Sequence, residues 1–265
     1  HLSPIRVYYL RMLKRLSHTY RLKELLNLEI ILFFLLVVGL CKGFSGGSPK
    51  QKKHKRYNRY QRTAYNAASG NSVFDTLFDD GKYGEFLIYS CLEDLGDAHK
   101  LLTNIYLPKV NGTTTEIDLI MISATGIYVF ESKNFSGWIF GDENSKYWKQ
   151  IFRGGRHYQF YNPIWQNKKH ISVLKQHLGL GDEVFRSYIV FSERCVLKKM
   201  SVYSPEVKVM NQDVLACEIA EDMMQRPEFF TPLEIEQIYN ELSRYTQADD
   251  ETKQAHIDAI KRRNP

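Results

Sequence analysis

Two apolar segments joined by a short turn, at residues 116–133, constrain the fold of this chain more than any other feature. Both segments are rich in Ile, Val, Phe and Tyr, which favour strands, and Ser123-Ala124-Thr125-Gly126 lies between them. A glycine-containing turn between two such runs predicts an antiparallel hairpin. If Ala124 and Thr125 form a two-residue loop, Ser123 lies opposite Gly126, and every other pair follows by counting outward.

In that register, the hairpin gathers acids and a lysine on one face of the sheet. Asp118 lies opposite Glu131, and Glu116 lies opposite Lys133. Directly opposed residues point to the same side of a sheet, with Cβ atoms roughly 5 Å apart. A shift by one residue would place Ser132 opposite Asp118 and separate the group. The grouping is therefore a prediction that depends on the register.

The lysine beside these carboxylates has two interpretations. Buried carboxylates are costly unless they are paired or bound to a cation, so Lys133 could simply form an ion pair with Glu116. Alternatively, two carboxylates can hold Mg²⁺, which takes oxygen ligands and keeps several waters. A nearby ammonium can then orient or deprotonate a water molecule and stabilise phosphate charge. The second interpretation predicts metal-dependent cleavage of a phosphodiester.

Further motifs surround the hairpin in a specific order. They are Gly84-Glu85-Phe86, Asn104-Ile105-Tyr106-Leu107-Pro108, Glu116-Ile117-Asp118, the run from Thr125 to Asn134, Ser136-Gly137-Trp138-Ile139-Phe140-Gly141 and Asn162-Pro163-Ile164-Trp165-Gln166-Asn167. This ordered set resembles the NERD (nuclease-related domain) family over about half of the chain. That family is assigned to the restriction-endonuclease-like fold of the Asp…(Asp/Glu)-x-Lys nucleases.

The resemblance implies a set of site residues. Asp118, Glu131 and Lys133 would form the nuclease core, with Glu85 as a further acid on the preceding helix and Gln166 on the following one. Mg²⁺ or Mn²⁺ would be held by Asp118, Glu131 and Glu85. The expected substrate is nucleic acid, DNA rather than RNA. The alternative is a non-catalytic, membrane-tethered module that binds nucleic acid or acts as a scaffold.

Charge is distributed unevenly along the chain, whose formal net charge is +6. Residues 1–62 contain 14 Lys/Arg and 2 Asp/Glu, a net +12, and residues 63–265 contain 22 and 28, a net −6. The basic surplus therefore belongs to the N-terminal segment. The nuclease-like domain is mildly acidic, which favours the non-catalytic alternative slightly, and its global charge does not supply a groove for a duplex.

Residues 25–44 form the most apolar segment. No charge occurs between Ile30 and Cys41, and with its flanks the segment reaches about 20 residues, enough for a helix to span a bilayer. A buried core helix and a cleaved signal peptide are the alternatives. More Lys and Arg follow the span than precede it, so the positive-inside rule predicts a single-pass protein of the cell membrane with its nuclease-like domain facing the cytoplasm.

These observations predict five regions: a basic N-terminal segment (1–24), a transmembrane helix (25–44), a basic linker (45–72), a nuclease-like domain (73–225), and a C-terminal helix and tail (226–265). The linker is expected to contact anionic lipid headgroups, and its Tyr57, Tyr60 and Tyr65 are candidates for stacking on bases. Alternating strand and helix patterns predict an α/β fold with a mixed central sheet flanked by helices. Four widely spaced cysteines argue against a disulfide framework and fit a reducing compartment.

Several remaining residues have mainly structural interpretations. Trp138 and Trp148 are expected to be core or sheet-packing residues. His170 and His177 share a helix face with Gln166, but such histidines are more often structural than catalytic. Asn162 followed by Pro163 predicts the start of that helix.

Overall fold

The computed structural model describes residues 49–96 and 98–263. The predicted basic N-terminal segment and transmembrane helix (1–44) lie outside these residues. In the part of the chain that is described, no helix is both long and apolar enough to cross a bilayer.

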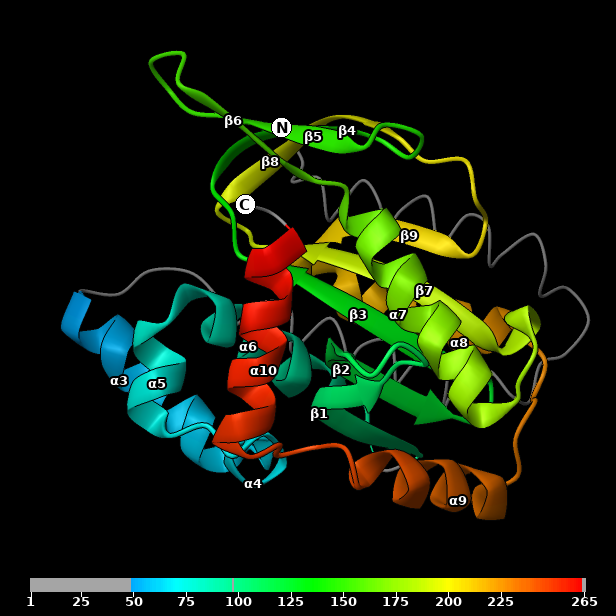
Figure 1. The fold of residues 1–265 in the computed structure, drawn as a ribbon. Coiled ribbons are helices and arrows are strands. Elements are labelled where there is room, and N and C mark those ends of the chain that lie inside the picture. The colour runs from blue at the N-terminus through cyan, green and yellow to red at the C-terminus, as the bar shows by residue number, and fades with distance from the viewer. Residues whose placement is uncertain (1–48, 97, 264–265) are drawn as a thin grey trace, which may run out of the picture. The chain divides into compact units, whose positions relative to one another are not determined.

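Two mixed β-sheets form the framework (Figure 1). The larger sheet has the order β1-β2-β3-β7-β9; β1, β2 and β3 are antiparallel neighbours, whereas β3, β7 and β9 are parallel. The second sheet has the order β6-β5-β4-β8, with β4 and β8 parallel. The strands are β1 (His99–Pro108), β2 (Thr114–Ser123), β3 (Gly126–Lys133), β4 (Gly137–Asp142), β5 (Tyr147–Ile151), β6 (His157–Tyr161), β7 (Phe185–Phe191), β8 (Cys195–Ser201) and β9 (Val207–Asn211).

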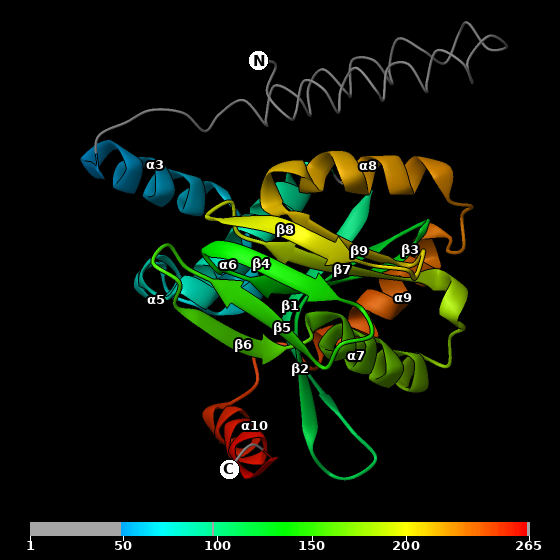
Figure 2. The same cartoon turned by 90° about the horizontal axis from the view of Figure 1, so that it is seen from above.

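Helices cover both faces of the larger sheet (Figures 1 and 2). On one face, Phe86 and Ile219 pack with Leu119 and Phe130, and on the other, Leu174 packs with Ile120. The predicted α/β class, a mixed sheet flanked by helices, is therefore confirmed. The helices are α3 (Pro49–Arg62), α4 (Tyr65–Ser69), α5 (Val73–Phe78), α6 (Asp80–Glu93), α7 (Pro163–Leu178), α8 (Leu215–Gln225), α9 (Pro232–Ser243) and α10 (Asp250–Arg263), with short 3₁₀ turns η1 (Asp182–Val184) and η2 (Gln212–Val214).

The central hairpin has the predicted register. Ser123 pairs with Gly126, and the pairing continues to Leu119 opposite Phe130, so Ala124 and Thr125 form the two-residue loop. Alternation then sends Ile120 and Val129 to the α7 face of the sheet, and Leu119 and Phe130 to the α6 face. Both faces are buried because helices cover both, which explains why the two strands are apolar almost throughout.

The second sheet packs through one face against the larger sheet and the start of α7. Ile139 and Trp148 are buried there with Ile164 and Phe191. The expectation that Trp148 belongs to the core is confirmed, since its exposed fraction is 1%. Trp138 does not belong to the core, because it lies on the other face of this sheet and is 41% exposed.

The predicted basic linker differs from the structure. Helices α3 and α4 occupy most of residues 45–72, and Tyr60 and Tyr65 are buried with Phe86 in the core. Their aromatic rings form edge and tilted contacts within the protein, so these two tyrosines cannot stack on bases, while Tyr57 is exposed. Basic residues of this segment also face the protein: the Arg56 guanidinium lies 4.5 Å from the centroid of the Tyr83 ring, and Arg59 Nε donates to Ser90 Oγ at 2.6 Å.

The C-terminal tail also folds, as α10. His256 on this helix is buried against Tyr106, with ring centroids 5.6 Å apart. The sequence of α10 is polar and shows no clear apolar face, but His256 holds the helix against β1 and β2.

Candidate active site

The five predicted site residues lie on four elements that meet where β2 and β3 separate. Glu85 comes from α6, Asp118 from β2, Glu131 and Lys133 from β3, and Gln166 from α7. The β2–β3 pairing ends at Leu119–Phe130, whereas β3 continues to pair with β7 as far as Lys133. At this separation the Asp118 carboxylate turns toward β3, and its Oδ2 accepts a hydrogen bond from the Ser132 backbone N–H at 2.8 Å.

Glu131 lies at the buried centre of the group, with 1% of its side chain exposed. Lys133 Nζ lies 2.5 Å from its Oε1, and His170 Nε2 lies 3.3 Å from its Oε2. The histidine contact is at ion-pair distance but lacks hydrogen-bond alignment, and neither of its two atoms has another hydrogen-bond partner among the described residues. Burial would raise the pKa of Glu131, but Lys133 and His170 hold it below its usual value.

Lys133 is surrounded by acceptors. Besides Glu131, its ammonium donates to Gln166 Oε1 at 3.3 Å. Burial opposes the charged ammonium, but Glu131 and Asp118 outweigh it and raise the pKa of Lys133. Lys133 is therefore firmly protonated near neutral pH, which suits it to donate hydrogen bonds and to neutralise negative charge.

The other two acids ionise less readily. The pKa of Asp118 is raised well above its usual value by burial and then by the charges of Glu131 and Glu85. Burial, followed by Glu116, raises the pKa of Glu85 to about 7. Neighbouring acids thus help to raise the pKa of Asp118, whereas Lys133 and His170 lower the pKa of Glu131. The three carboxylates share one electrostatic environment.

Close helix packing places Glu85 in this environment. A Cβ atom on the preceding residue, Gly84, would lie 2.8 Å from Ser132 Oγ and 3.2 Å from Asn134 Cβ. Glycine therefore permits α6 to lie directly against the end of β3. Asp79 caps α6 by accepting a hydrogen bond from the Lys82 N–H.

Helix α7, which carries Gln166 and His170, is held at its N-terminal end by two asparagines. Asn162 is the predicted N-cap, and its Oδ1 accepts from the Ile164 N–H at 2.9 Å, with Pro163 in the first turn. Asn167 is fully buried and donates to the Val129 carbonyl at 2.8 Å and to Ser187 Oγ at 2.9 Å. These bonds fix the rotation of α7, so that Gln166 and His170 face the site.

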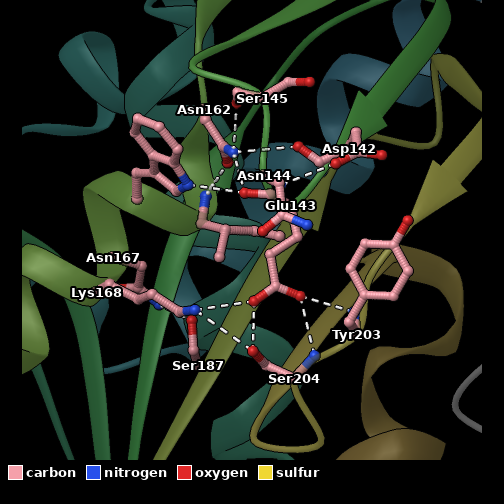
Figure 3. A network of polar contacts seen from close by, with 12 residues as sticks. Asp142, Glu143, Asn144, Ser145, Asn162, Asn167, Lys168, Ser187, Tyr203 and Ser204 are labelled. Atoms are coloured by element: carbon pink, nitrogen blue, oxygen red, sulfur yellow. Dashed lines mark hydrogen bonds and ion pairs between the residues drawn. The ribbon is translucent and has the colours of Figure 1, made fainter.

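A buried acid outside the predicted set, Glu143, links α7 to the second sheet (Figure 3). Its carboxylate accepts hydrogen bonds from Lys168 Nζ at 2.8 Å, from the backbone N–H groups of Tyr203 and Ser204 at 2.7 and 2.9 Å, and from the Ser204 hydroxyl. Burial would raise the pKa of Glu143, but these donors lower it to about 2. Glu143 therefore stays ionised and pins the turn after β4 to α7.

Glu116 is not the charge partner of Lys133. It accepts a hydrogen bond from the Tyr106 hydroxyl at 2.6 Å, and His256 Nε2 lies 3.8 Å from its other oxygen. The interpretation of Lys133 as an ion pair with Glu116 is thus wrong, because Lys133 turns toward Glu131 on its own strand. Through His256, α10 covers the side of the site formed by Glu116.

The acids fit a hard divalent cation that takes few protein ligands. The described residues contain no group of three or more His, Cys, Asp or Glu side chains arranged to hold a metal. Mg²⁺, however, is commonly bound through one or two carboxylates and keeps several waters. Asp118 and Glu131 offer oxygens of that kind, and Glu131 Oε2 is buried without a hydrogen-bond donor. Glu85 is a further oxygen donor in the same environment.

The contact that sequence reasoning undervalued is the one between His170 and Glu131. His170 is buried, and its Nδ1 lies 2.8 Å from Thr115 Oγ1, so the ring spans Thr115 and Glu131. The sequence contained a signal for this contact, since His170 lies one helical turn after Gln166 and therefore on the same face of α7. His177, two turns further, instead contacts Glu241 away from the site. Lys168 and Lys169, on the same helix, donate hydrogen bonds to Glu143 and to the Tyr161 hydroxyl.

Comparison with known proteins identifies the family of the chain. The family model for the nuclease-related domain matches residues 80–192, which include all five predicted site residues. An uncharacterized protein of Bacillus anthracis is 33% identical over 184 residues, which cover 67% of this chain and 82% of that relative. No solved structure matches the chain significantly. The chain therefore belongs to the nuclease-related domain (NERD) family.

Proposed function

We propose that this protein is a divalent-metal-dependent nuclease that cleaves DNA, with Asp118, Glu131 and Glu85 as the metal-binding acids. The observation that carries the proposal is the buried Lys133 ammonium in contact with Glu131, beside Asp118 at the separation of β2 and β3. An ion pair that served stability alone would need neither Asp118, whose pKa is raised by burial and by Glu131, nor Gln166. The same arrangement supports a restriction-endonuclease-like fold.

Each residue has a chemical role in this proposal. A bound Mg²⁺ or Mn²⁺ would supply Lewis acidity toward a phosphate oxygen and a more acidic water molecule. Lys133, protonated and held by Gln166, donates a hydrogen bond that orients the attacking water or stabilises the charge developing on the phosphate. Its raised pKa favours these roles over proton abstraction. His170 holds the Glu131 carboxylate from the side opposite Lys133.

The alternative function is a non-catalytic module that binds nucleic acid or acts as a scaffold. It is favoured by two observations: the charge of Glu131 is already balanced by Lys133, and no cluster of three metal-ligating side chains is preformed in the described residues. A cation would then have to compete with an existing ion pair.

The cellular setting is also a proposal. Residues 25–44 would anchor the protein in the cell membrane as a single span, with the nuclease-like domain on the cytoplasmic side. The support is the apolar run from Ile30 to Cys41 and the excess of Lys and Arg after it.

Incubation of the purified protein with labelled DNA and RNA, single- and double-stranded, tests the activity in Mg²⁺, in Mn²⁺ and in EDTA. The proposal expects cleavage of DNA that EDTA stops and that Asp118→Asn, purified in the same way, lacks. Equal cleavage by the variant would identify a contaminating nuclease. Absence of cleavage of every substrate with either metal would favour the non-catalytic module.

A further inference from the structure

The second sheet has an outer face on which exposed aromatic and basic side chains alternate with the buried core residues of its inner face. Trp138 and Tyr147 are 41% and 49% exposed, whereas their sequence neighbours Ile139 and Trp148 are buried. Val196 pairs with Trp138 across the β4–β8 edge and is 50% exposed. Exposed apolar area of this extent on one sheet face is typical of a binding surface. We call this surface the aromatic–basic face; it comprises Trp138, Tyr147, Lys149, Val196, Lys198 and Lys199.

Positive charge concentrates on and around this face. The strands and turns over 137–161 and 195–201 contain Lys146, Lys149, Arg153, Arg156, Lys198 and Lys199 against Asp142 and Glu143, a net +4. The rest of residues 63–265 therefore carries a net −10. All six basic side chains are exposed, and none forms an ion pair with any residue that the structure describes. The Glu143 carboxylate is buried and accepts hydrogen bonds, among them one from the Tyr203 backbone N–H, so it adds little negative potential at the surface of this face.

The cations and rings lie together. Lys198 Nζ is 5.4 Å from the centroid of the Trp138 ring, and Lys146 Nζ is 5.2 Å from that of Tyr147. A flat ring beside an ammonium offers a base a stacking surface and its phosphate a counter-charge. In a duplex the base faces are already stacked on one another, so this chemistry selects unpaired nucleotides.

We propose that the aromatic–basic face binds single-stranded nucleic acid. This face is close in the chain to the candidate active site. If the proposed nuclease function holds, on which this step rests, the bound strand is the substrate. Residues 134–136 alone separate Lys133 from β4, and β6 leads through Asn162 into α7 with Gln166. A strand stacked on Trp138 would therefore be held on β4, the strand that follows the proposed catalytic lysine in the chain, which makes single-stranded DNA the expected substrate.

Fluorescence anisotropy of the full chain with a labelled oligo(dT) of about 12 nucleotides, within the range that one such surface covers, tests the binding in EDTA. Trp138→Ala should weaken the affinity about 5- to 150-fold, the measured range for one stacked base. Lys149→Gln with Lys199→Gln should lower the magnitude of the logarithmic salt slope by about 1.4, since each single-strand phosphate contact contributes about 0.7. Phe74→Ala removes another exposed aromatic ring elsewhere, and Lys100→Gln with Arg244→Gln removes equal charge; both controls should bind normally.

Tryptophan fluorescence gives a local readout that the basic N-terminal segment cannot mask. Oligo(dT) should quench the emission of the parent protein, and the quenching should disappear in Trp138→Phe. Binding without this quenching, or equal losses in the control variants, would overturn the proposal, as would a duplex that competes as well as the single strand. Binding is measured in EDTA, where metal-dependent cleavage cannot occur, and cleavage is measured separately in Mg²⁺. Trp138-dependent binding without cleavage would refute the nuclease function alone. Cleavage without Trp138-dependent binding would refute the role of the aromatic–basic face alone.

Discussion

Gly84 on α6 packs so closely against Ser132 on β3 that a Cβ atom at position 84 would lie 2.8 Å from Ser132 Oγ. The next residue after Gly84 is Glu85, and the two neighbours of Ser132 are Glu131 and Lys133. The contact thus sets how far the acid on the helix lies from the acid and the lysine on the strand. The distance between α6 and β3, and with it the geometry of the site, therefore depends on the absence of a side chain at position 84.

Gly84→Ala should therefore displace α6 and reduce cleavage more than stability. The added methyl gains up to about 1 kcal/mol of helix propensity but meets a crowding cost of about 1–3 kcal/mol. Adding Ser132→Ala removes the nearer contact and should restore part of both properties, although Asn134 Cβ at 3.2 Å remains. Urea unfolding and cleavage rates of the single and double variants measure this coupling. Gly81→Ala, on the exposed first turn of α6, is the control; a similar loss of activity there would contradict the close-packing argument.

Lys133→Ala should reduce cleavage at least about 100-fold, because the ammonium stabilises charge that develops on the phosphate. Its effect on metal affinity should be small or favourable, since an ammonium competes with the cation for Glu131. Asp118→Ala should lose both cleavage and metal binding. Calorimetric titration with Mn²⁺, beside the cleavage assay, separates these outcomes. Loss of Mn²⁺ binding in a folded Lys133→Ala protein would show that the lysine organises the site rather than the reaction.

His170→Ala should destabilise the protein by about 1–3 kcal/mol, because it leaves Thr115 without its buried partner and removes one of the two groups that hold Glu131. His177→Ala on the same helix is the matched control. Its partner Glu241 is 37% exposed, so that loss should stay below about 1 kcal/mol. Chemical unfolding of both variants at pH 7 tests the difference. Equal losses would mean that the Thr115–His170–Glu131 contact adds nothing beyond helix packing.

Glu143→Gln should show a stability loss that depends on pH. The pKa of Glu143 in the folded protein is about 2, below the ordinary value of 4.5, so the ionised carboxylate stabilises the fold above pH 4.5 and this contribution fades as the pH falls toward 2. The contribution is at most about 3 kcal/mol, and we expect about 2 kcal/mol because Lys168 is 43% exposed. Urea unfolding between pH 7 and pH 3 should therefore show the two proteins converging at low pH. A constant difference would assign the effect to shape rather than to charge.

Deletion of residues 1–48 should yield a folded protein that needs no detergent. Residues 48–265 form one compact unit with its own core, and the shortened protein keeps that core. Sedimentation of detergent-free lysates compares the full chain, expected in the membrane fraction, with the shortened one, expected in the supernatant. A full chain that remains in the supernatant would contradict the membrane anchor.

The central hairpin and the start of α7 could be predicted from the sequence because their signals are local. The β2–β3 register follows from a two-residue turn and from alternation along two adjacent strands. Asn162 and Pro163 act within one turn of the helix that they begin. Asp118, Glu131 and Lys133 reach the same site for this local reason, whereas Glu85 and Gln166 could be assigned to it through the family resemblance alone.

The partners of charged groups could not be predicted, because they depend on side-chain direction and on contacts between distant segments. Strand pairing suggested Glu116 for Lys133, yet burial beside Gln166 and His170 draws the ammonium toward Glu131. The edge strands of the second sheet, β6 and β8, could not be predicted either. Polar and basic residues replace in them the apolar alternation that identifies an inner strand.

The sequence by itself determined that Asp118, Glu131 and Lys133 share one sheet face and how the central strands are registered, since both are properties of short segments. The tertiary structure alone decided that Tyr60 and Tyr65 are core residues, that His170 holds Glu131, and that Trp138 faces outward. Which side chains lose contact with water and which remain exposed depends on which helices and strands pack together. It is this packing that sets the pKa of each acid in the site and leaves one sheet face free to bind.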